Sequence, residues 1–166
     1  NNGQGNGDTE SGAYLLAGGT PVPSNAATIS RQAVAKVFLP SENEWYKAAY
    51  YNPASSSYYL YPTSSNIPPT ASAPTAVANS ANFNSVVGAP TNVGAYSNSA
   101  SPYGAFDMGG NVFQWNEQLF DGGDRGLRGG MYLTSDAALK SSFRSSFNPQ
   151  SDFLWGFRVA MIPGPQ

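Results

Sequence analysis

The stretch FDMGGNVFQW at residues 106–115 carries most of the information about the fold of this chain. Its glycine pair allows positive backbone φ angles and the close approach of another segment, and apolar and aromatic residues flank the pair. Three more motifs stand in order around it: LPSENEWYKAA at 39–49, LRGG at 127–130 and GFRV at 156–159. Four ordered motifs of this kind indicate a single folded unit.

Residues 41–52 show the pattern of a capped helix. Ser41 is a typical N-cap residue, and Glu44 three positions later completes a capping box. Trp45 follows at helical spacing, which predicts that its indole anchors the helix in the core. Asn52 and Pro53 end the predicted helix, because proline lacks the backbone N–H that another turn would need.

The other local patterns predict short strands separated by loops. We expect strands near 13–16, over 33–39 and over 159–162, and several short strands joined by tight turns between residues 82 and 115. The segment 62–80 is rich in Pro, Ser and Thr, so we expect an extended surface loop there. Its composition is also typical of O-glycosylated segments, and a bare ordered loop is the alternative.

Composition limits the size of the domain and the classes of partner. A chain of 166 residues with 40% apolar residues can bury a core of its own as one domain. Only 11% of the residues are charged and the net charge is −2, which gives no long-range field to attract nucleic acid. No apolar run reaches the roughly 18 residues of a membrane span. The many Ser, Thr, Asn and Gly residues suit an extracellular or cell-surface protein.

Taken together, the four motifs resemble the C-terminal half of the formylglycine-generating enzyme (sulfatase-modifying factor) family. That resemblance implies an α+β fold, a variant of the C-type-lectin-like fold that is rich in loops, with short antiparallel strands and few helices. Residues 1–166 would form a single domain of this type, with 62–80 as a loop within it. Because the family domain normally begins earlier, the resemblance also implies that the chain lacks an N-terminal portion of the fold.

The chain lacks cysteine and histidine, and these two absences determine which metal chemistry the resemblance allows. In the catalytic members of the family, two cysteines just past the Gly-Gly pair bind copper, and their positions fall on Thr134 and Leu139. The chain contains no Cys and no His, so it has neither a thiolate nor the imidazoles that the iron-dependent relatives use. We therefore predict a member of the family that is not an enzyme and binds neither copper nor iron.

The resemblance also implies a calcium site in the first motif. Its ligands would be the side chains of Asp107 and Gln114 and the backbone carbonyls of Gly110 and Val112, all of them oxygen atoms of the kind that calcium prefers. Gln114 stands where the family enzymes often have Glu, so one negative charge is lost. The alternative is that Asp107 and Gln114 only hold a Gly-rich turn.

A second and weaker calcium site would involve Asn82 and the carbonyl of Phe83. After Phe83, the next acidic residue is Asp107, so this site lacks a nearby carboxylate. Asp121 and Asp124 offer another reading, as a general acid–base pair of an enzyme. We expect instead that they are turn carboxylates paired with nearby arginines.

Arginines and aromatic residues complete the set of candidates. Arg128, Arg144 and Arg158 are expected to be partly buried and to make bidentate hydrogen bonds to carboxylates or carbonyls. The segment matching the active cleft of the enzymes predicts a surface that recognises a peptide or a sugar ring, with core packing and a protein interface as alternatives. Its predicted residues are Tyr132, Thr134, Leu139, Phe143, Phe147, Phe153 and Trp155.

These observations predict an extracellular or cell-surface domain that acts by binding or assembly, such as the subunit of a surface polymer. Its expected partners are other copies of itself or a separate N-terminal fragment, with a glycan as a further ligand and calcium as the cofactor. Two alternatives stay open. One is a divergent metal-dependent oxidase of the formylglycine-generating or sulfoxide-synthase type, and the other is a carbohydrate-binding lectin-like module.

Overall fold

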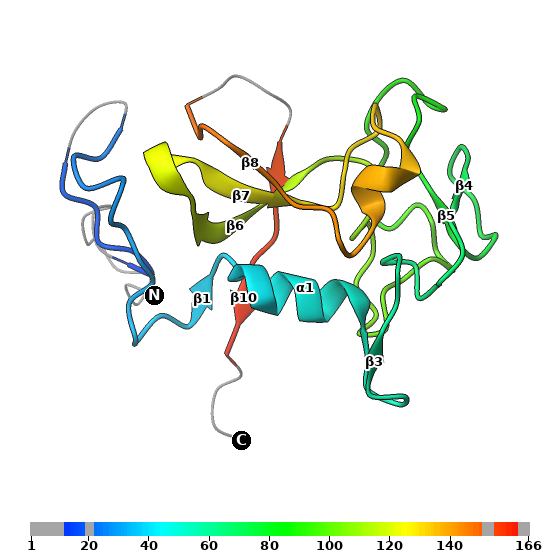
Figure 1. The fold of residues 1–166 in the computed structure, drawn as a ribbon, viewed down its shortest axis with the longest axis horizontal. Coiled ribbons are helices and arrows are strands. Elements are labelled where there is room, and N and C mark those ends of the chain that lie inside the picture. Colours follow the sequence, from blue (N-terminus) through cyan, green and yellow to red (C-terminus); the bar gives the residue numbers. More distant parts are fainter. Residues whose placement is uncertain (1–11, 19–21, 151–154, 163–166) are drawn as a thin grey trace.

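The computed structural model describes residues 12–18, 22–150 and 155–162, and the elements below lie within them. Figure 1 shows α1 running beside the strands β6, β7 and β8, with long loops around β3, β4 and β5. In chain order the elements are β1 (Val37–Phe38), α1 (Glu42–Tyr50), β2 (Tyr51–Asn52), β3 (Ser57–Tyr58), β4 (Thr70–Ala71), β5 (Ser80–Ala81), β6 (Gln114–Leu119), the 3-10 helix η1 (Asp121–Gly123), β7 (Arg125–Arg128), the 3-10 helix η2 (Asp136–Leu139), β8 (Ser145–Phe147), β9 (Gly156–Phe157) and β10 (Ala160–Met161).

Helix α1 begins where its sequence pattern predicts but ends at Tyr50, two residues earlier than expected, because Tyr51 and Asn52 form β2. The Ser41 hydroxyl accepts the Glu44 backbone N–H at 3.2 Å, and the Glu44 carboxylate accepts the Ser41 N–H at 2.7 Å. Tyr51 returns to extended backbone and caps the C-terminus. The capping box is therefore confirmed. The predicted burial of Trp45 is confirmed as well, since it is only 1% exposed.

The largest sheet has four strands in the order β8-β7-β6-β9. Strands β6 and β7 pair antiparallel with Gln114 opposite Arg128, β7 and β8 are also antiparallel, and β6 and β9 are parallel. The remaining pairs are β1 with β10, β2 with β3, and the parallel pair β4 with β5. The pairing of β1 with β10 joins the segment before α1 to the last described strand.

Strand β6 has two chemically different faces, because successive side chains point to opposite sides of a strand. Gln114, Asn116 and Gln118 form an amide row on one face, and the first two bond to α1 side chains. Trp115 and Glu117 alternate with them and line a groove on the other face. The single strand therefore connects the helix packing to the groove.

The structure corrects several strand predictions. Residues 82–113, all of them described, contain no strand and instead form turns and bends. Some of their backbone N–H groups donate hydrogen bonds to side chains instead of to a neighbouring strand. The Gly94 N–H, for example, donates to the Asp107 carboxylate at 2.7 Å. The expected strand at 33–39 shortens to Val37–Phe38, and the one at 13–16 reduces to a single bridge between Tyr14 and Arg31.

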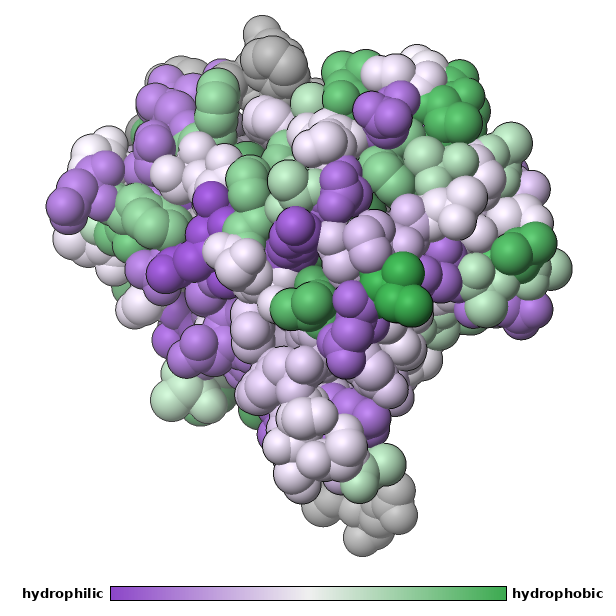
Figure 2. Space-filling model, turned by 45° about the vertical axis from the view of Figure 1, so that its right-hand side comes forward, coloured by the Kyte–Doolittle hydropathy of each residue, from purple (hydrophilic) through white to green (hydrophobic). Residues whose placement is uncertain are grey.

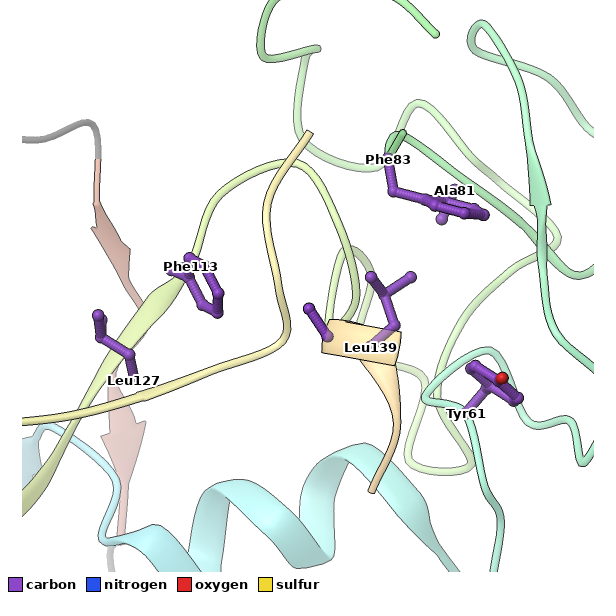
Figure 3. Close-up of a cluster of buried hydrophobic side chains, with 7 residues drawn as sticks. Tyr61, Ala81, Phe83, Phe113, Leu127 and Leu139 are labelled. Atoms are coloured by element: carbon purple, nitrogen blue, oxygen red, sulfur yellow. The ribbon is translucent and has the colours of Figure 1, made fainter. Parts of the chain in front are cut away.

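The core has two clusters of buried hydrophobic side chains. The cluster under α1 contains Trp45, Ala49, Tyr50 and Met108. Figure 3 shows the other, which gathers side chains from the sheet and from loops. Its buried members are Tyr61, Ala81, Phe83, Phe113, Leu127, Ala138 and Leu139.

Leu139 was expected on a recognition surface, and this expectation is wrong. Its side chain is fully buried, because η2 turns it into the second core cluster. The buried Tyr50 hydroxyl also donates to the Leu139 carbonyl at 3.0 Å, so both parts of the residue serve packing.

Figure 2 shows one face of the molecule, on which hydrophobic residues lie singly or in small groups among hydrophilic ones. Scattered apolar residues of this kind are usual on protein surfaces. Among the described residues, no helix has the length and apolar character needed to cross a membrane.

Gly126 on β7 is required by a close contact with the amide row. A Cβ atom added at Gly126 would lie 2.3 Å from the Asn116 Oδ1 atom. Asn116 is 1% exposed, and its amide donates to Glu42 at 2.6 Å while its oxygen accepts the Gln118 N–H at 2.9 Å. The Asn116 side chain is thus held on three sides.

Gly126→Ala should therefore lower the free energy of unfolding by about 2 kcal/mol, because the added methyl displaces a buried, hydrogen-bonded amide. Urea denaturation measures this change. Gly12→Ala is the matched control, since no atom lies within 4 Å of the added Cβ there, and its effect should stay within about 0.5 kcal/mol. Equal stability of the two variants would contradict the steric role of Gly126.

Candidate functional site

A groove lies between the N-terminal described segments and the face of β6 that points away from α1. The hollow beside Trp115 has a volume of about 450 Å³. Two neighbouring hollows of about 270 and 710 Å³ share the lining residues Ile29 and Arg125 with it. The hollow beside Trp115 is lined by Tyr14, Leu16, Ile29, Leu39, Trp115, Asn116, Glu117, Arg125, Pro149 and Phe157.

The walls of the groove are mostly apolar and aromatic. Trp115 comes from β6, Phe157 from β9, and Tyr14 and Leu16 from the N-terminal segment. Phe157 is 69% exposed. Sequence reasoning did not identify this site. The available signal was the alternation of Trp115 and Glu117 with the amide residues of β6, which marks a strand with two occupied faces.

Arg125 contributes a positive charge to all three hollows. Its Nη1 donates to the Glu117 carbonyl at 3.0 Å, and its Nη2 donates to the carbonyls of Ala26 at 3.0 Å and Ile29 at 3.3 Å. Among the described residues, no carboxylate forms an ion pair with it. Its charge therefore remains available to an anionic group in the groove.

A charged network fixes the N-terminal segment against the sheet and the helix. Arg31 binds Glu117 through Nε at 2.9 Å and Nη2 at 2.6 Å, and binds Glu44 through Nη1 at 3.1 Å and Nη2 at 2.7 Å. The Tyr14 hydroxyl donates to Glu117 at 2.6 Å and accepts the Leu39 N–H at 2.9 Å. Burial, together with the bond to Glu117, raises the pKa of Tyr14. The network thus holds one wall of the groove in place.

The hydrogen bonds from Arg31 lower the pKa of Glu44 from 4.5 to about 2. A carboxyl whose pKa is lowered in the folded state contributes stability above its unfolded pKa, and this contribution is lost as the pH falls towards the folded pKa. Glu44 is 46% exposed, so its contribution at neutral pH is at most about 1 kcal/mol.

Glu44→Gln should therefore be slightly less stable than the wild type at pH 7, and the difference should vanish as the pH falls from about 5 to 2. Urea denaturation across this pH range measures both effects. A repeat in high salt should shrink the difference at pH 7, because exposed ion pairs are screened. A stability difference that does not change with pH would contradict the assignment.

The loop predicted to bind calcium is held together by Gln114. The Gln114 oxygen accepts from Trp45 Nε1 at 2.9 Å and from Arg158 Nε at 2.6 Å, and its amide donates to the Asp107 carbonyl at 2.6 Å. Arg158 also donates to the Phe106 carbonyl at 2.8 Å. A guanidinium bonded to the proposed ligand oxygen does not fit a cation at this position. The geometry favours the alternative in which Asp107 and Gln114 hold the turn, and calcium there stays a prediction.

The second predicted calcium site has one feature that fits a cation. Asn82 is 1% exposed, and its amide donates to the Ala89 carbonyl at 2.8 Å, but its Oδ1 atom is buried without a hydrogen-bond partner among the described residues. Phe83 beside it belongs to the core, and its carbonyl accepts the Val86 N–H at 3.2 Å. No group of three or more His, Cys, Asp or Glu gathers within the described ranges. Calcium binding at Asn82 stays a prediction.

The predicted aromatic recognition surface is only partly assembled. Phe143 and Trp155 pack against the core through Phe113, with ring centroids 6.2 and 5.4 Å from it. Phe147 stands beside Trp155 at 5.5 Å and is 39% exposed. The Thr134 hydroxyl bonds to the backbone of Met131.

The two remaining members of that predicted surface add little to it. Tyr132 is half-buried, and its backbone N–H donates to the Asn111 carbonyl at 3.0 Å. Phe153 lies outside the described residues. The recognition surface therefore stays a prediction, centred on Phe147.

Arg128 and Arg158 bind carboxylate or carbonyl oxygens as predicted, but the prediction for Arg144 is wrong, because its side chain is 50% exposed and contacts Glu42 through Nε alone. Arg128 binds Glu42 through two of its nitrogens and donates to the carbonyls of Ser141 and Phe143, while Arg144 lies 3.2 Å from Glu42. In the described part of the chain, Asp121 and Asp124 form no ion pair with an arginine. Their expected pairing with arginines is wrong, because the arginines reach carbonyls and Glu42 instead.

Comparison with known proteins assigns the family. Residues 22–162 match the family profile described as the sulfatase-modifying factor enzyme 1-like domain. The chain belongs to this family. The family resemblance and the fold class that the sequence predicts, a loop-rich α+β variant of the C-type-lectin-like fold, are confirmed.

Two solved structures share the fold. Treponema denticola variable protein 1 matches with a TM-score of 0.58 and 21% identity, over 90% of this chain and 55% of the other. CarF matches with a TM-score of 0.60 and 24% identity, over 91% of this chain and 58% of the other. At this level of identity the likeness concerns the fold alone.

The curated relatives are similar in sequence as well. Hercynine oxygenase of Mycobacterium tuberculosis is 34% identical over 142 residues, which covers 74% of this chain and 32% of the relative. Hercynine oxygenase of Mycolicibacterium smegmatis is 31% identical over 146 residues, with the same two coverages. This chain therefore spans about a third of the length of the curated relatives that it matches.

These relatives overturn the prediction that the chain is not an enzyme, because proteins named as oxygenases match it at 31–34% identity. The family metal nevertheless does not fit the positions that the resemblance assigned to it. Leu139 is an aliphatic core residue, and Thr134 has its hydroxyl bonded to the Met131 backbone. Neither residue supplies a ligand for copper or iron.

Proposed function

We propose that this domain binds and orients the organic substrate of a metal-dependent oxygenase. The observation that carries the proposal is the similarity to proteins named hercynine oxygenase, which extends over 74% of this chain. The groove beside β6 supplies a place where such a substrate can bind.

Substrate binding fits this chain better than metal binding does. Copper and iron centres in proteins rely largely on imidazole and thiolate ligands, and these 166 residues contain no His and no Cys. The ligands of such a centre would therefore belong to residues outside this sequence. The bound metal would supply the chemistry with dioxygen, whereas the residues described here would hold the organic molecule.

The groove has the size and lining of a small-molecule site. The hollow beside Trp115, of about 450 Å³, lies within the range of roughly 300–1,000 Å³ that is typical of ligand pockets. Trp115, Tyr14 and Phe157 offer aromatic faces to a ring. Arg125 offers a positive charge that no carboxylate in the described residues neutralises. The preferred ligand is therefore a small molecule with an apolar or aromatic body and an anionic group.

The test is a calorimetric titration of the protein with hercynine, the compound in the name of the relatives. Arg125→Met and Phe157→Ala should each weaken binding at least tenfold, because one removes the charge and the other an aromatic wall. Lys140→Met and Val93→Ala are matched controls at exposed positions outside the groove, and should leave the affinity unchanged. Absence of binding, or equal binding by all four variants, would contradict the proposal.

A further inference from the structure

A separate polar hollow lies at the N-terminal end of α1, on the opposite face of β6 from the groove. Its volume is about 400 Å³. Its lining residues are Glu42, Asn43, Tyr46, Gln118, Arg128 and Arg144. None of these residues lines the proposed substrate groove, to which the amide row contributes Asn116 instead.

The hollow holds more positive than negative charge. Glu42 supplies the carboxylate, and two guanidinium groups share it: Arg128 Nε lies 2.7 Å and Arg144 Nε 3.2 Å from the Glu42 Oε1 atom. The other Glu42 oxygen accepts the Asn116 amide at 2.6 Å. Both oxygens of Glu42 are thus engaged, and the lining keeps a net charge of one positive unit.

The two arginines differ in their exposure to solvent and in their hydrogen bonds. Arg128 is 5% exposed, and its terminal nitrogens donate to Glu42, Ser141 and Phe143. Arg144 is 50% exposed, and neither of its terminal nitrogens has a hydrogen-bond partner among the described residues. Its guanidinium is positioned by Glu42 and by the Phe120 ring, whose centroid lies 5.4 Å away. The guanidinium of Arg144 therefore offers parallel N–H donors in a fixed orientation, and this geometry binds a carboxylate through two hydrogen bonds.

The surroundings of Arg144 add donors and positive potential. Ser41 caps the Glu44 N–H, but the N–H of Asn43 has no partner within the helix. The partial positive charge at the start of α1 acts in the same direction as the arginine. Tyr46 lies under Arg128, with the guanidinium 5.2 Å from its ring centroid, and gives the hollow an aromatic wall.

We propose that this hollow binds a small organic carboxylate, held by the terminal nitrogens of Arg144 and the N-terminal end of α1. A singly charged carboxylate matches the single excess positive charge. A doubly charged phosphate fits less well, because Glu42 lies 3.2 Å from the same guanidinium and repels the second negative charge. An aromatic carboxylate gains a further contact with Tyr46.

The experiment is an NMR titration of the ¹⁵N-labelled protein with benzoate at constant ionic strength, following the Arg144 Nε–H and Asn43 backbone signals. Both signals should shift and saturate in the millimolar range. Arg144→Met should weaken binding at least tenfold, and Arg144→Lys, which keeps the charge without the fork, should weaken it several-fold. Lys47→Met, which removes one exposed positive charge from the same helix, should leave the affinity within twofold of the wild type.

Inorganic phosphate is the competing ligand in this design. It should bind more weakly than benzoate, and tighter binding of phosphate at the same signals would overturn the assignment to a carboxylate. Signals that do not saturate with benzoate, or equal affinities for the wild type and Arg144→Met, would overturn the site itself. Because the hollow and the groove share no lining side chain that is tested, these results are independent of the binding of hercynine.

Discussion

The ion pair between Glu42 on α1 and Arg128 on β7 is the contact on which the rest of the architecture depends. The two side chains are 13% and 5% exposed, and removing one partner of a buried pair leaves an uncompensated charge. The same guanidinium donates to the carbonyls of Ser141 and Phe143 in the loop before β8. The Arg128 side chain thus connects the helix, the sheet and the loop. The Asn116 amide donates to the other oxygen of the Glu42 carboxylate.

Strand β6 lies between the two candidate binding regions, the groove and the polar hollow at α1, and its contacts with α1 fix the orientation of both faces. Its amide row bonds to α1, so its other face must turn Trp115 and Glu117 towards the N-terminal segment. Glu117 then binds Arg31, which ties that segment down and forms the far wall of the groove. Polar contacts that pack the helix therefore determine where the proposed substrate groove lies, on the opposite side of the strand.

The sequence was informative where the signal was local or carried by several motifs. The capping box of Ser41 and Glu44 lies within one turn, and the four ordered motifs were enough for the fold. Burial of Leu139 and the partners of Gln114 depend on contacts 44–89 residues away along the chain, which no local pattern encodes. The chain contains no His and no Cys, and the absence of bound copper or iron stays a prediction. The same absences led to the prediction that the chain is not an enzyme, which was wrong because proteins named as oxygenases match it at 31–34% identity.

A double-mutant cycle with Glu42→Gln and Arg128→Met, followed by urea denaturation, tests the central claim most directly. Each single variant should lose about 3 kcal/mol or more, because it leaves a buried charged group without its partner. The double variant should lose much less than the sum of the two, which gives a coupling energy of at least about 2 kcal/mol. A coupling energy below about 0.5 kcal/mol, as for an exposed ion pair, would contradict the claim that this pair holds α1 on the sheet.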